Sequence, residues 1–304
     1  MVLRELRMVG IEIINPTYGS RTKFSDEMID RAAEVERIIT IEYPLLLSFA
    51  KIYNNEALQA RYLIEKDLLA LPKQAKILEI GAGNLALSIQ LASEGYFVCA
   101  IEPVGSGFNP MRVFIETYLK IASDSKIVLE FHDVKIENFK SPIKFDYCFA
   151  INVLEHVDDP RQVIHHVMTM ASNNFRIYCP NYDFPYEPHF GKFLFHRKNQ
   201  AFYLKRQEAI NPDLYDAAGL YESLNFITFR KLKATILKLR LVAKVNKNVN
   251  LELLSRATSD EYLNGRHKIL AKVSWIFSHL GIKWFLKLVP LRWSPVIDLT
   301  ISRV

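Results

Sequence analysis

A histidine and a nearby acid stand out in the stretch CPNYDFPYEPHFG, residues 179–191. His189 can accept a proton near neutral pH, and Glu187, two residues earlier, can orient its imidazole ring. The three prolines exclude a regular helix or a central strand, while the four aromatic side chains offer the flat apolar walls of a small-molecule site. We therefore predict a loop that contacts a substrate, with His189 as the catalytic base. Packing of His189 between the prolines and the aromatic rings is the alternative interpretation.

His156 is a second candidate, in the stretch INVLEHVDDP, residues 151–160. It follows Glu155, directly after an apolar run that is typical of a buried strand. Two interpretations stay open for His156: a second catalytic group, or a side chain that lines the wall of a cofactor site.

A glycine turn between two predicted strands carries the clearest binding signal. The stretch AKILEIGAGNLALSIQLASEGYFVCAIEP, residues 75–103, indicates a strand, a turn, a helix that ends near Gly95, and a second strand. Gly81 and Gly83 allow the backbone to approach a ligand closely, and the N-terminus of the following helix favours an electronegative group. Glu102, at the end of the second strand, can accept hydrogen bonds from ribose hydroxyls. The arrangement predicts a site for a nucleotide-like ligand.

The alternation of strands and helices continues to residue 180. It predicts a third strand that ends near Asp133, a fourth strand over KFDYCFAINV, a helix after Asp159-Pro160, and a fifth strand over NFRIYCP, residues 174–180. Short crossovers force these strands to be parallel, and ligands then bind beyond their carboxyl ends. The loop of His189 follows the fifth strand, so we predict that it borders the ligand crevice.

The rest of the chain predicts a distinctive ending of the fold. Its expected elements are a helix at about 229–239, a strand at about 240–246, a helical insertion at about 250–290, and a final strand in SPVIDLTISRV. We predict a Rossmann-like α/β fold with a seven-stranded sheet, mostly parallel with an antiparallel last strand. GAGNLA also fits a loose dinucleotide fingerprint, G-x-G-x-x-A. This ending and the mostly helical residues 1–70 oppose a dehydrogenase.

These motifs resemble those of the class I S-adenosylmethionine (SAM)-dependent methyltransferases, in the ubiquinone-biosynthesis-like group (methyltransferase types 11 and 12). LEIGAGN is similar to their first motif, Glu102 to the acid after the second strand, and Asp133 to the adenine-side acid after the third. INVLEHVDDP looks like their motif after the fourth strand. The resemblance covers about residues 71–185. It implies SAM as the cofactor and a methyltransferase domain over residues 71–304, with a substrate-side loop at 181–225 and an N-terminal helical extension before it.

The resemblance also implies which residues bind the cofactor. The implied contacts are Glu79, Gly81 and Gly83 on the methionine side, Glu102 at the ribose hydroxyls, Asp133, Val134, Asn152 and Val153 around the adenine, and Asn84 and Pro103 beside them. For Glu79 and Asp133, the alternative interpretation is an acid that only supports the fold.

The sequence departs from the pattern of this family at two positions. Leu85 stands where the third glycine of the first motif is usual, which predicts a tighter turn around the methionine moiety. Some related methyltransferases look as if they place a divalent ion on a Glu-x-x-Glu-His motif, whose first glutamate is Asn152 here. Glu155, His156 and His189 could still form a set of hard ligands. With one carboxylate lost, we predict no metal site.

Charge is unevenly placed along the chain. Residues 226–304 hold 15 Lys and Arg against four Asp and Glu, so the C-terminal third is basic. This favours an anionic partner or surface, or else a solvated basic face. Residues 268–287 predict a basic amphipathic helix with tryptophans, which either packs on its own domain or contacts a membrane interface. A charged N-terminus unlike a signal peptide and three cysteines without metal spacing predict a cytoplasmic protein, with peripheral membrane contact left open.

Methyl transfer to a hydroxyl is the activity that we predict. The sulfonium of SAM leaves without needing an acid, whereas a hydroxyl acceptor must lose its proton to a base such as His189. The expected acceptor is a small molecule or a glycan or lipid precursor. One alternative is an RNA-directed methyltransferase, but nucleic acid is not the predicted partner because no basic motif interleaved with aromatic residues is present. The other alternative is a SAM-binding protein without transferase activity.

Overall fold

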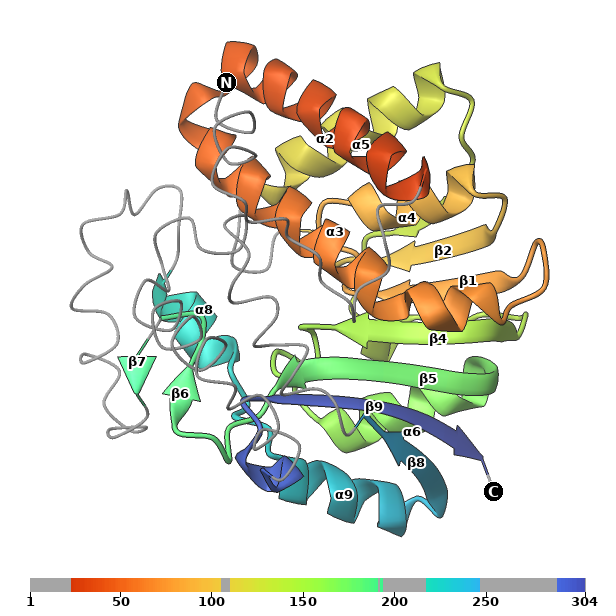
Figure 1. Ribbon diagram of the computed structural model, residues 1–304, viewed down its shortest axis with the longest axis vertical. Helices are drawn as coiled ribbons and strands as arrows, with labels where there is room; N and C mark the ends of the chain where they lie inside the picture. The colour runs from red at the N-terminus through yellow and green to blue at the C-terminus, as the bar shows by residue number, and fades with distance from the viewer. Residues whose placement is uncertain (1–22, 105–109, 191, 194–216, 247–288, 304) are drawn as a thin grey trace, which may run out of the picture.

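A seven-stranded sheet forms the centre of the protein, with the order β3-β2-β1-β4-β5-β9-β8 (Figure 1). The computed structural model describes residues 23–104, 110–190, 192–193, 217–246 and 289–303. The neighbouring strands from β3 to β5 are parallel, and β9 is antiparallel to both β5 and β8. The strands of this sheet are β1 (Lys76–Ile80), β2 (Phe97–Ile101), β3 (Glu130–His132), β4 (Phe145–Ile151), β5 (Ala171–Pro180), β8 (Leu241–Val245) and β9 (Val296–Arg303). The predicted Rossmann-like sheet with an antiparallel last strand is confirmed.

Helices cover both faces of the sheet (Figure 1). One face packs against α3 (Leu47–Leu69), α4 (Ala86–Ser93) and α5 (Met111–Asp124), and α2 (Lys23–Glu42) packs on these helices. The other face packs against α6 (Pro160–Met170) and α9 (Phe229–Lys238). The remaining described elements are the helix α8 (Ala217–Ser223), the strand pair β6 (Tyr186–Glu187) and β7 (Lys192–Phe193), and the 3-10 turns η1 (Pro44–Leu46), η2 (Ile136–Asn138) and η3 (Leu291–Trp293).

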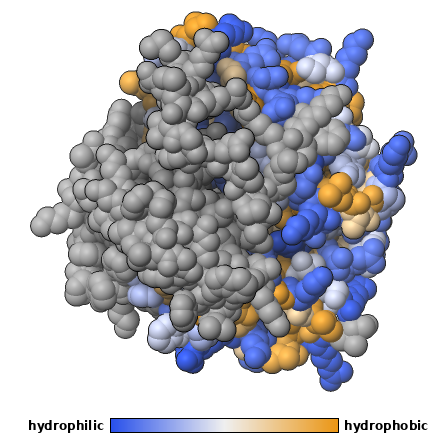
Figure 2. Space-filling view, viewed as in Figure 1, coloured by the Kyte–Doolittle hydropathy of each residue, from blue (hydrophilic) through white to orange (hydrophobic). Residues whose placement is uncertain are grey.

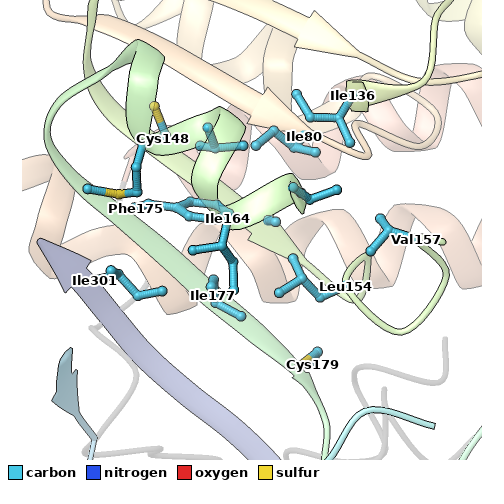
Figure 3. Close-up of a cluster of buried hydrophobic side chains, with 14 of the residues drawn as sticks. Ile80, Ile136, Cys148, Leu154, Val157, Ile164, Phe175, Ile177, Cys179 and Ile301 are labelled. Carbon is cyan, nitrogen blue, oxygen red and sulfur yellow. The ribbon is translucent and has the colours of Figure 1, made fainter. Parts of the chain in front are cut away.

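The central strands are apolar on both faces because helices cover both. Along β1, Ile77 packs toward the first group of helices and Leu78 toward the second. Figure 3 shows part of the second cluster, in which Phe175 and Ile177 of β5 lie beside Ile164 of α6. The three cysteines, Cys99, Cys148 and Cys179, are all buried in strands.

Local sequence signals set the start of α6 and the end of α4. Asp159 accepts a hydrogen bond from the backbone N–H of Arg161 at 2.8 Å, and Pro160 is the first residue of α6, as predicted. Gly95 follows α4 with a φ of +95°, a conformation that glycine adopts without strain. Asp159 and Pro160 thus fix where α6 begins, and Gly95 fixes where the chain leaves α4 and returns to the sheet at β2.

Two strands differ in length from the prediction. The third strand, predicted over KIVLEFHDV (residues 126–134), is only Glu130–His132, because it lies at the edge of the sheet and pairs with β2 alone. The fifth strand begins at Ala171, before the predicted residue 174, because Ala171 pairs with Phe145 of β4. The predicted helical insertion at about 250–290 and its basic face lie outside the described residues.

Ion pairs attach α3 to the sheet. Arg176 on β5 forms an ion pair with Asp298 on β9 and another with Asp67 on α3, both at 2.8 Å. Removing one partner of so buried a pair is strongly destabilising, since the other charge stays buried. Arg176 thus links α3, which precedes the sheet in the sequence, to β9, which is the last strand of the sheet.

The described surface is mainly polar. Figure 2 shows hydrophilic side chains over most of the visible described face, with hydrophobic ones in separate groups. Exposed apolar residues are separated in the fold, such as Ile41 on α2, Leu69 at the end of α3 and Val128 before β3. Within the described ranges, no helix combines the length and the apolar character needed to cross a membrane.

Candidate active site

The glycine turn follows β1 at the carboxyl edge of the sheet. Gly81 and Gly83 have φ values of +69° and +53°. The backbone N–H of Gly81 donates to the carbonyl of Ile101 at 2.8 Å, which holds the turn beside the end of β2. A Cβ atom on Gly81 would lie 2.2 Å from Cγ2 of Val153, whereas one on Gly83 would meet nothing within 4 Å. Only glycine therefore fits at position 81.

Glu102 lies against this turn. Its Oε2 accepts a hydrogen bond from the backbone N–H of Gly83 at 2.9 Å. Burial raises the pKa of Glu102 to about 7, the Gly83 N–H opposes this rise, and Asp133 adds to it. Donors placed near this carboxyl, such as the hydroxyls of a ribose, would stabilise its ionised form.

Glu79 is buried beneath the turn. It accepts a hydrogen bond from the hydroxyl of Ser88 on α4, which joins β1 to that helix. Burial raises the pKa of Glu79 to about 8, with the Ser88 bond opposing and the charge of Glu102 adding. This geometry supports the fold directly, and a contact with the cofactor stays a prediction.

Asp133 follows β3 and holds the chain that follows β2. Its Oδ1 accepts a hydrogen bond from the backbone N–H of Val104 at 2.7 Å, and Arg112 lies 3.7 Å from its Oδ2. The next residue, Val134, is partly buried against the core. Pro103, between Glu102 and Val104, is partly exposed at the same edge.

Asn152 and Val153 follow β4. Asn152 has a φ of +56°, a conformation that asparagine tolerates better than most residues, and its backbone N–H donates to the carbonyl of Tyr178 at 2.7 Å. Its side chain is exposed, while Val153 is partly buried against Gly81. The chain after β4 thus lies against the glycine turn after β1.

Leu85 adopts the conformation for which glycine is usual in the related motif. Its φ is +68°, and its side chain is fully buried. Such a backbone costs an ordinary residue about 1–3 kcal/mol. The burial of the side chain offsets that strain, so the turn keeps its shape without the third glycine.

Beyond the ends of β4 and β5, His189 and Glu187 form a close pair. Nδ1 of His189 lies 2.6 Å from Oε1 of Glu187, which also accepts a hydrogen bond from the Tyr182 hydroxyl at 3.1 Å. The other oxygen of the fully buried Glu187 accepts from the backbone N–H of Phe190 at 2.5 Å. Burial lowers the pKa of His189, but the hydrogen bond and charge of Glu187 and the charge of Glu155 outweigh it and raise the pKa above its ordinary value.

His156 faces His189 directly. Their Nε2 atoms are 3.3 Å apart. Nδ1 of His156 lies 2.9 Å from the hydroxyl of Ser223, and that hydroxyl donates to the carbonyl of Leu220 at 2.8 Å, so Nδ1 must be the protonated nitrogen. Burial, with the neighbouring His189, lowers the pKa of His156 to about 3. His156 is therefore neutral, with the lone pair of Nε2 directed at His189.

Glu155 completes a cluster of three. One ligand atom each of Glu155, His156 and His189 lies within 4.8 Å of the others. Glu155 is fully buried, and neither carboxylate oxygen has a hydrogen-bond partner within the described part of the chain. Burial raises the pKa of this carboxyl to about 7. Its Oε1 lies 4.0 Å from Nε2 of His156, and a buried carboxylate without a hydrogen bond is consistent with a catalytic role or with a site that an ion or water completes.

The structure brings the predicted residues to one edge of the sheet, in two groups. The glycine turn, Glu102 and Asp133 follow β1, β2 and β3, while His156 and His189 follow β4 and β5 (Figure 1). The contact of Val153 with Gly81 links the two groups. Sequence reasoning missed Ser223, which orients His156 from a helix 67 residues away and carries no recognisable motif.

Comparison with known proteins adds two kinds of relative. The protein Rv1509 of Mycobacterium tuberculosis, which is uncharacterized, is 32% identical over 258 residues, covering 82% of this chain and 85% of Rv1509. The mitochondrial ubiquinone biosynthesis O-methyltransferase of Schizosaccharomyces pombe is 33% identical over 105 residues, covering 34% of this chain and 36% of that enzyme.

The chain is also similar to a solved structure. The YcgJ protein of Bacillus subtilis is 11% identical with a TM-score of 0.45, over 79% of this chain and 97% of YcgJ. No family model matches the sequence. The chain belongs to the family of Rv1509.

Proposed function

We propose that this enzyme transfers the methyl group of SAM to a hydroxyl of a small molecule, with His189 as the base that accepts the hydroxyl proton. The pairing of His189 with Glu187 carries the proposal. Because the Glu187 carboxylate accepts the Nδ1 proton at 2.6 Å, the neutral imidazole keeps its lone pair on Nε2. A base held in one tautomer by a buried carboxylate is the arrangement that proton removal needs.

The residues of the chain position the reactants and move one proton. Bound SAM supplies an activated methyl group and a neutral leaving group. Glu102 and the glycine turn would hold SAM at the ends of β1 and β2, and the loop of His189 would hold the acceptor. Once His189 has taken the proton, Glu187 stabilises the imidazolium on one side. Neutral His156 offers its Nε2 lone pair on the other side, 3.3 Å away.

A small-molecule acceptor has support from relatives and from the loop. The ubiquinone-pathway relatives are named as O-methyltransferases, although the alignment with the yeast enzyme covers about a third of either chain. Both oxygens of Glu187 are held by aromatic residues of the loop, one by the hydroxyl of Tyr182 and the other by the backbone N–H of Phe190, and both rings are buried in the core. The proposed acceptors include a glycan precursor or a lipid precursor. The cytoplasmic location and the peripheral membrane contact of the basic C-terminal third stay predictions.

The histidine cluster also fits a divalent ion. Both Nδ1 atoms are engaged as donors, so both Nε2 atoms present lone pairs, and Glu155 adds two oxygens without partners in the described chain. Orientation of each ligating histidine through its other nitrogen is typical of metal sites. Glu155, His156 and His189 would hold the ion, which would supply a Lewis acid for the acceptor hydroxyl. Activity that survives a chelator supports proton transfer to free His189. Activity lost to the chelator and restored by Mg²⁺ or Mn²⁺ supports the ion.

Isotope transfer tests the proposed function even though the acceptor is unidentified. The purified enzyme is incubated with methyl-labelled SAM and either a lipid extract or a polar small-molecule extract, and labelled products are identified by mass spectrometry. We expect a product that gains one methyl group on oxygen. RNA that takes up the label in a parallel incubation would instead support an RNA-directed enzyme. Tight binding of SAM without transfer to any fraction would support a binding protein.

Replacement of Glu102 by alanine is expected to weaken SAM binding by about 1.5–3 kcal/mol, the usual range for hydrogen bonds to a charged group. The variant also removes the acceptor for the Gly83 N–H, so the turn loses support. Isothermal titration calorimetry with SAM measures the change. Glu102→Gln keeps an acceptor oxygen and should lose less. Equal affinity of wild type and Glu102→Ala would show that Glu102 does not bind the ribose.

Replacement of Glu187 by glutamine is expected to change the pH profile of turnover. His189 must be neutral to act as a base, so turnover rises with pH through the pKa of His189. Glu187 raises that pKa, and its loss should therefore shift the acidic limb to lower pH while lowering the plateau, because the imidazole becomes a weaker base. Tyr182→Phe removes only the neutral partner of Glu187 and should shift the limb much less. An unshifted limb in Glu187→Gln would exclude His189 as the group that titrates.

A further inference from the structure

We infer that Asn54 of α3 is a positioning residue for the cofactor turn, so that the helices before the sheet set the affinity for SAM. The inference rests on the proposed binding of SAM at the glycine turn. It starts from Asn84, which lies between Gly83 and the strained Leu85.

The side chain of Asn84 is buried, and both ends of its amide form hydrogen bonds. It is 3% exposed. Its Oδ1 accepts a hydrogen bond from the backbone N–H of Ala86 at 3.1 Å, which supports the first turn of α4. Its Nδ2 donates to Oδ1 of Asn54 at 2.8 Å. The turn is thus tied to α3 by a buried side-chain hydrogen bond.

Asn54 joins four elements at one buried point. Its Oδ1 accepts from Asn84 and also from the hydroxyl of Tyr118 on α5, at 2.7 Å. Its Nδ2 donates to Oε1 of Glu36 on α2 at 3.0 Å and to the carbonyl of Ala32 at 3.4 Å. Every donor and acceptor position of the amide is used, so its orientation is fixed. Because all its hydrogen bonds are made, burial of the Asn54 amide costs little free energy, and the amide fixes the relative positions of the groups that it bonds.

The turn needs such external support for two reasons. Leu85 holds a φ of +68°, a strained backbone that persists only when its surroundings impose it. Gly83, on the other side of Asn84, donates its N–H to Glu102, the proposed ribose-binding acid. A movement of Asn84 would therefore displace both the glycine backbone and its contact with Glu102. Asn54 therefore positions the glycine turn and its contact with Glu102 by holding Asn84 in place.

Binding of SAM by a set of variants tests the inference. Asn54→Ala leaves the buried Asn84 amide and Tyr118 hydroxyl without their acceptor, and we expect the Kd for SAM, measured by calorimetry, to rise about ten-fold or more. Asn54→Asp keeps Oδ1 as the acceptor but places a second carboxylate beside Glu36. For Asn54→Asp we expect a lower melting temperature and a Kd for SAM within about two-fold of wild type. This variant keeps the test possible if Asn54→Ala does not fold.

Arg61→Ala is the matched control. Arg61 is also buried on α3 and also reaches α4, but it pairs with Glu94 at the far end of that helix, at 2.9 Å. We expect a lower melting temperature and an unchanged Kd. A Kd that rises in Arg61→Ala as much as in Asn54→Ala would show general loosening and overturn the inference.

A double variant gives a readout that a merely stabilising role would not change. If Asn54 acts on SAM through Asn84, the Kd of Asn54→Ala/Asn84→Ala should equal that of Asn84→Ala alone. Effects that multiply would contradict this route, as would a wild-type Kd in Asn54→Ala. If the wild-type protein itself does not bind SAM, the proposed function fails instead, and the two failures are thereby distinguished.

Discussion

His189→Ala is expected to reduce turnover about 10²–10⁴-fold, the usual contribution of a positioned general base, and to leave the Kd for SAM nearly unchanged. The difference follows from position, because His189 lies in the loop after β5, whereas the predicted SAM contacts follow β1 to β4. Turnover with the labelled acceptor and calorimetry with SAM measure the two quantities separately. His189→Gln should recover little if proton removal matters, and much if positioning by hydrogen bonds suffices.

His165→Ala serves as the control, since His165 is exposed on α6 and should keep wild-type turnover. A wild-type rate in His189→Ala would assign the base to His156, the facing imidazole. Loss of SAM binding in that variant would assign the loop to the cofactor and contradict our interpretation of residues 181–190.

Gly81→Val is expected to abolish the rise in melting temperature that SAM produces in the wild-type protein by binding its folded state. A side chain at position 81 meets Val153 at 2.2 Å and also strains a backbone with a φ of +69°. The loop after β4 must then move away from the turn, which separates the two parts of the site. Differential scanning fluorimetry with SAM, and with NAD as the non-binding comparison, measures the effect.

Gly83→Ala distinguishes the effect of backbone strain from that of a steric clash with Val153. Its φ of +53° is strained for alanine, but the added Cβ meets nothing within 4 Å, so part of the SAM response should remain. Gly81→Ala/Val153→Ala leaves the Cβ of residue 153, at 3.2 Å, as the nearest atom and should recover part of the response that Gly81→Ala loses. Stabilisation by NAD but not by SAM would contradict the class assignment itself.

Much of the fold was predictable because local signals and long-range topology agree. The apolar runs of β1, β2 and β4, the glycines between them, and the Asp159-Pro160 cap each depend on neighbouring residues only. Short crossovers then dictate parallel strands. The length of β5 was less predictable, because its first residue joins the sheet through pairing with Phe145 of β4, on the far side of α6 in the sequence.

The candidate site was predictable in its residue types more than in its contacts. Glu187 and His189 are two residues apart, so their pairing could be expected from the sequence. Nothing near His156 indicates that Ser223 orients it, and nothing near Asn84 indicates that Asn54 holds it. Such hydrogen bonds depend on how whole helices pack, and neither spacing nor composition records this. The lack of a hydrogen-bond partner for the Glu155 carboxylate within the described residues likewise depends on the folded structure and has no sequence signal.

The position of β9 inside the sheet has a consequence for how this chain is made. During synthesis β5 emerges long before β9, and β8 can join the sheet only through β9. The edge of β5 therefore stays unpaired while the intervening residues are translated, and unpaired edges of this kind are prone to association with other chains. Arg176 cannot meet Asp298 until then either. We expect the nascent chain to depend on chaperone protection until β9 has left the ribosome.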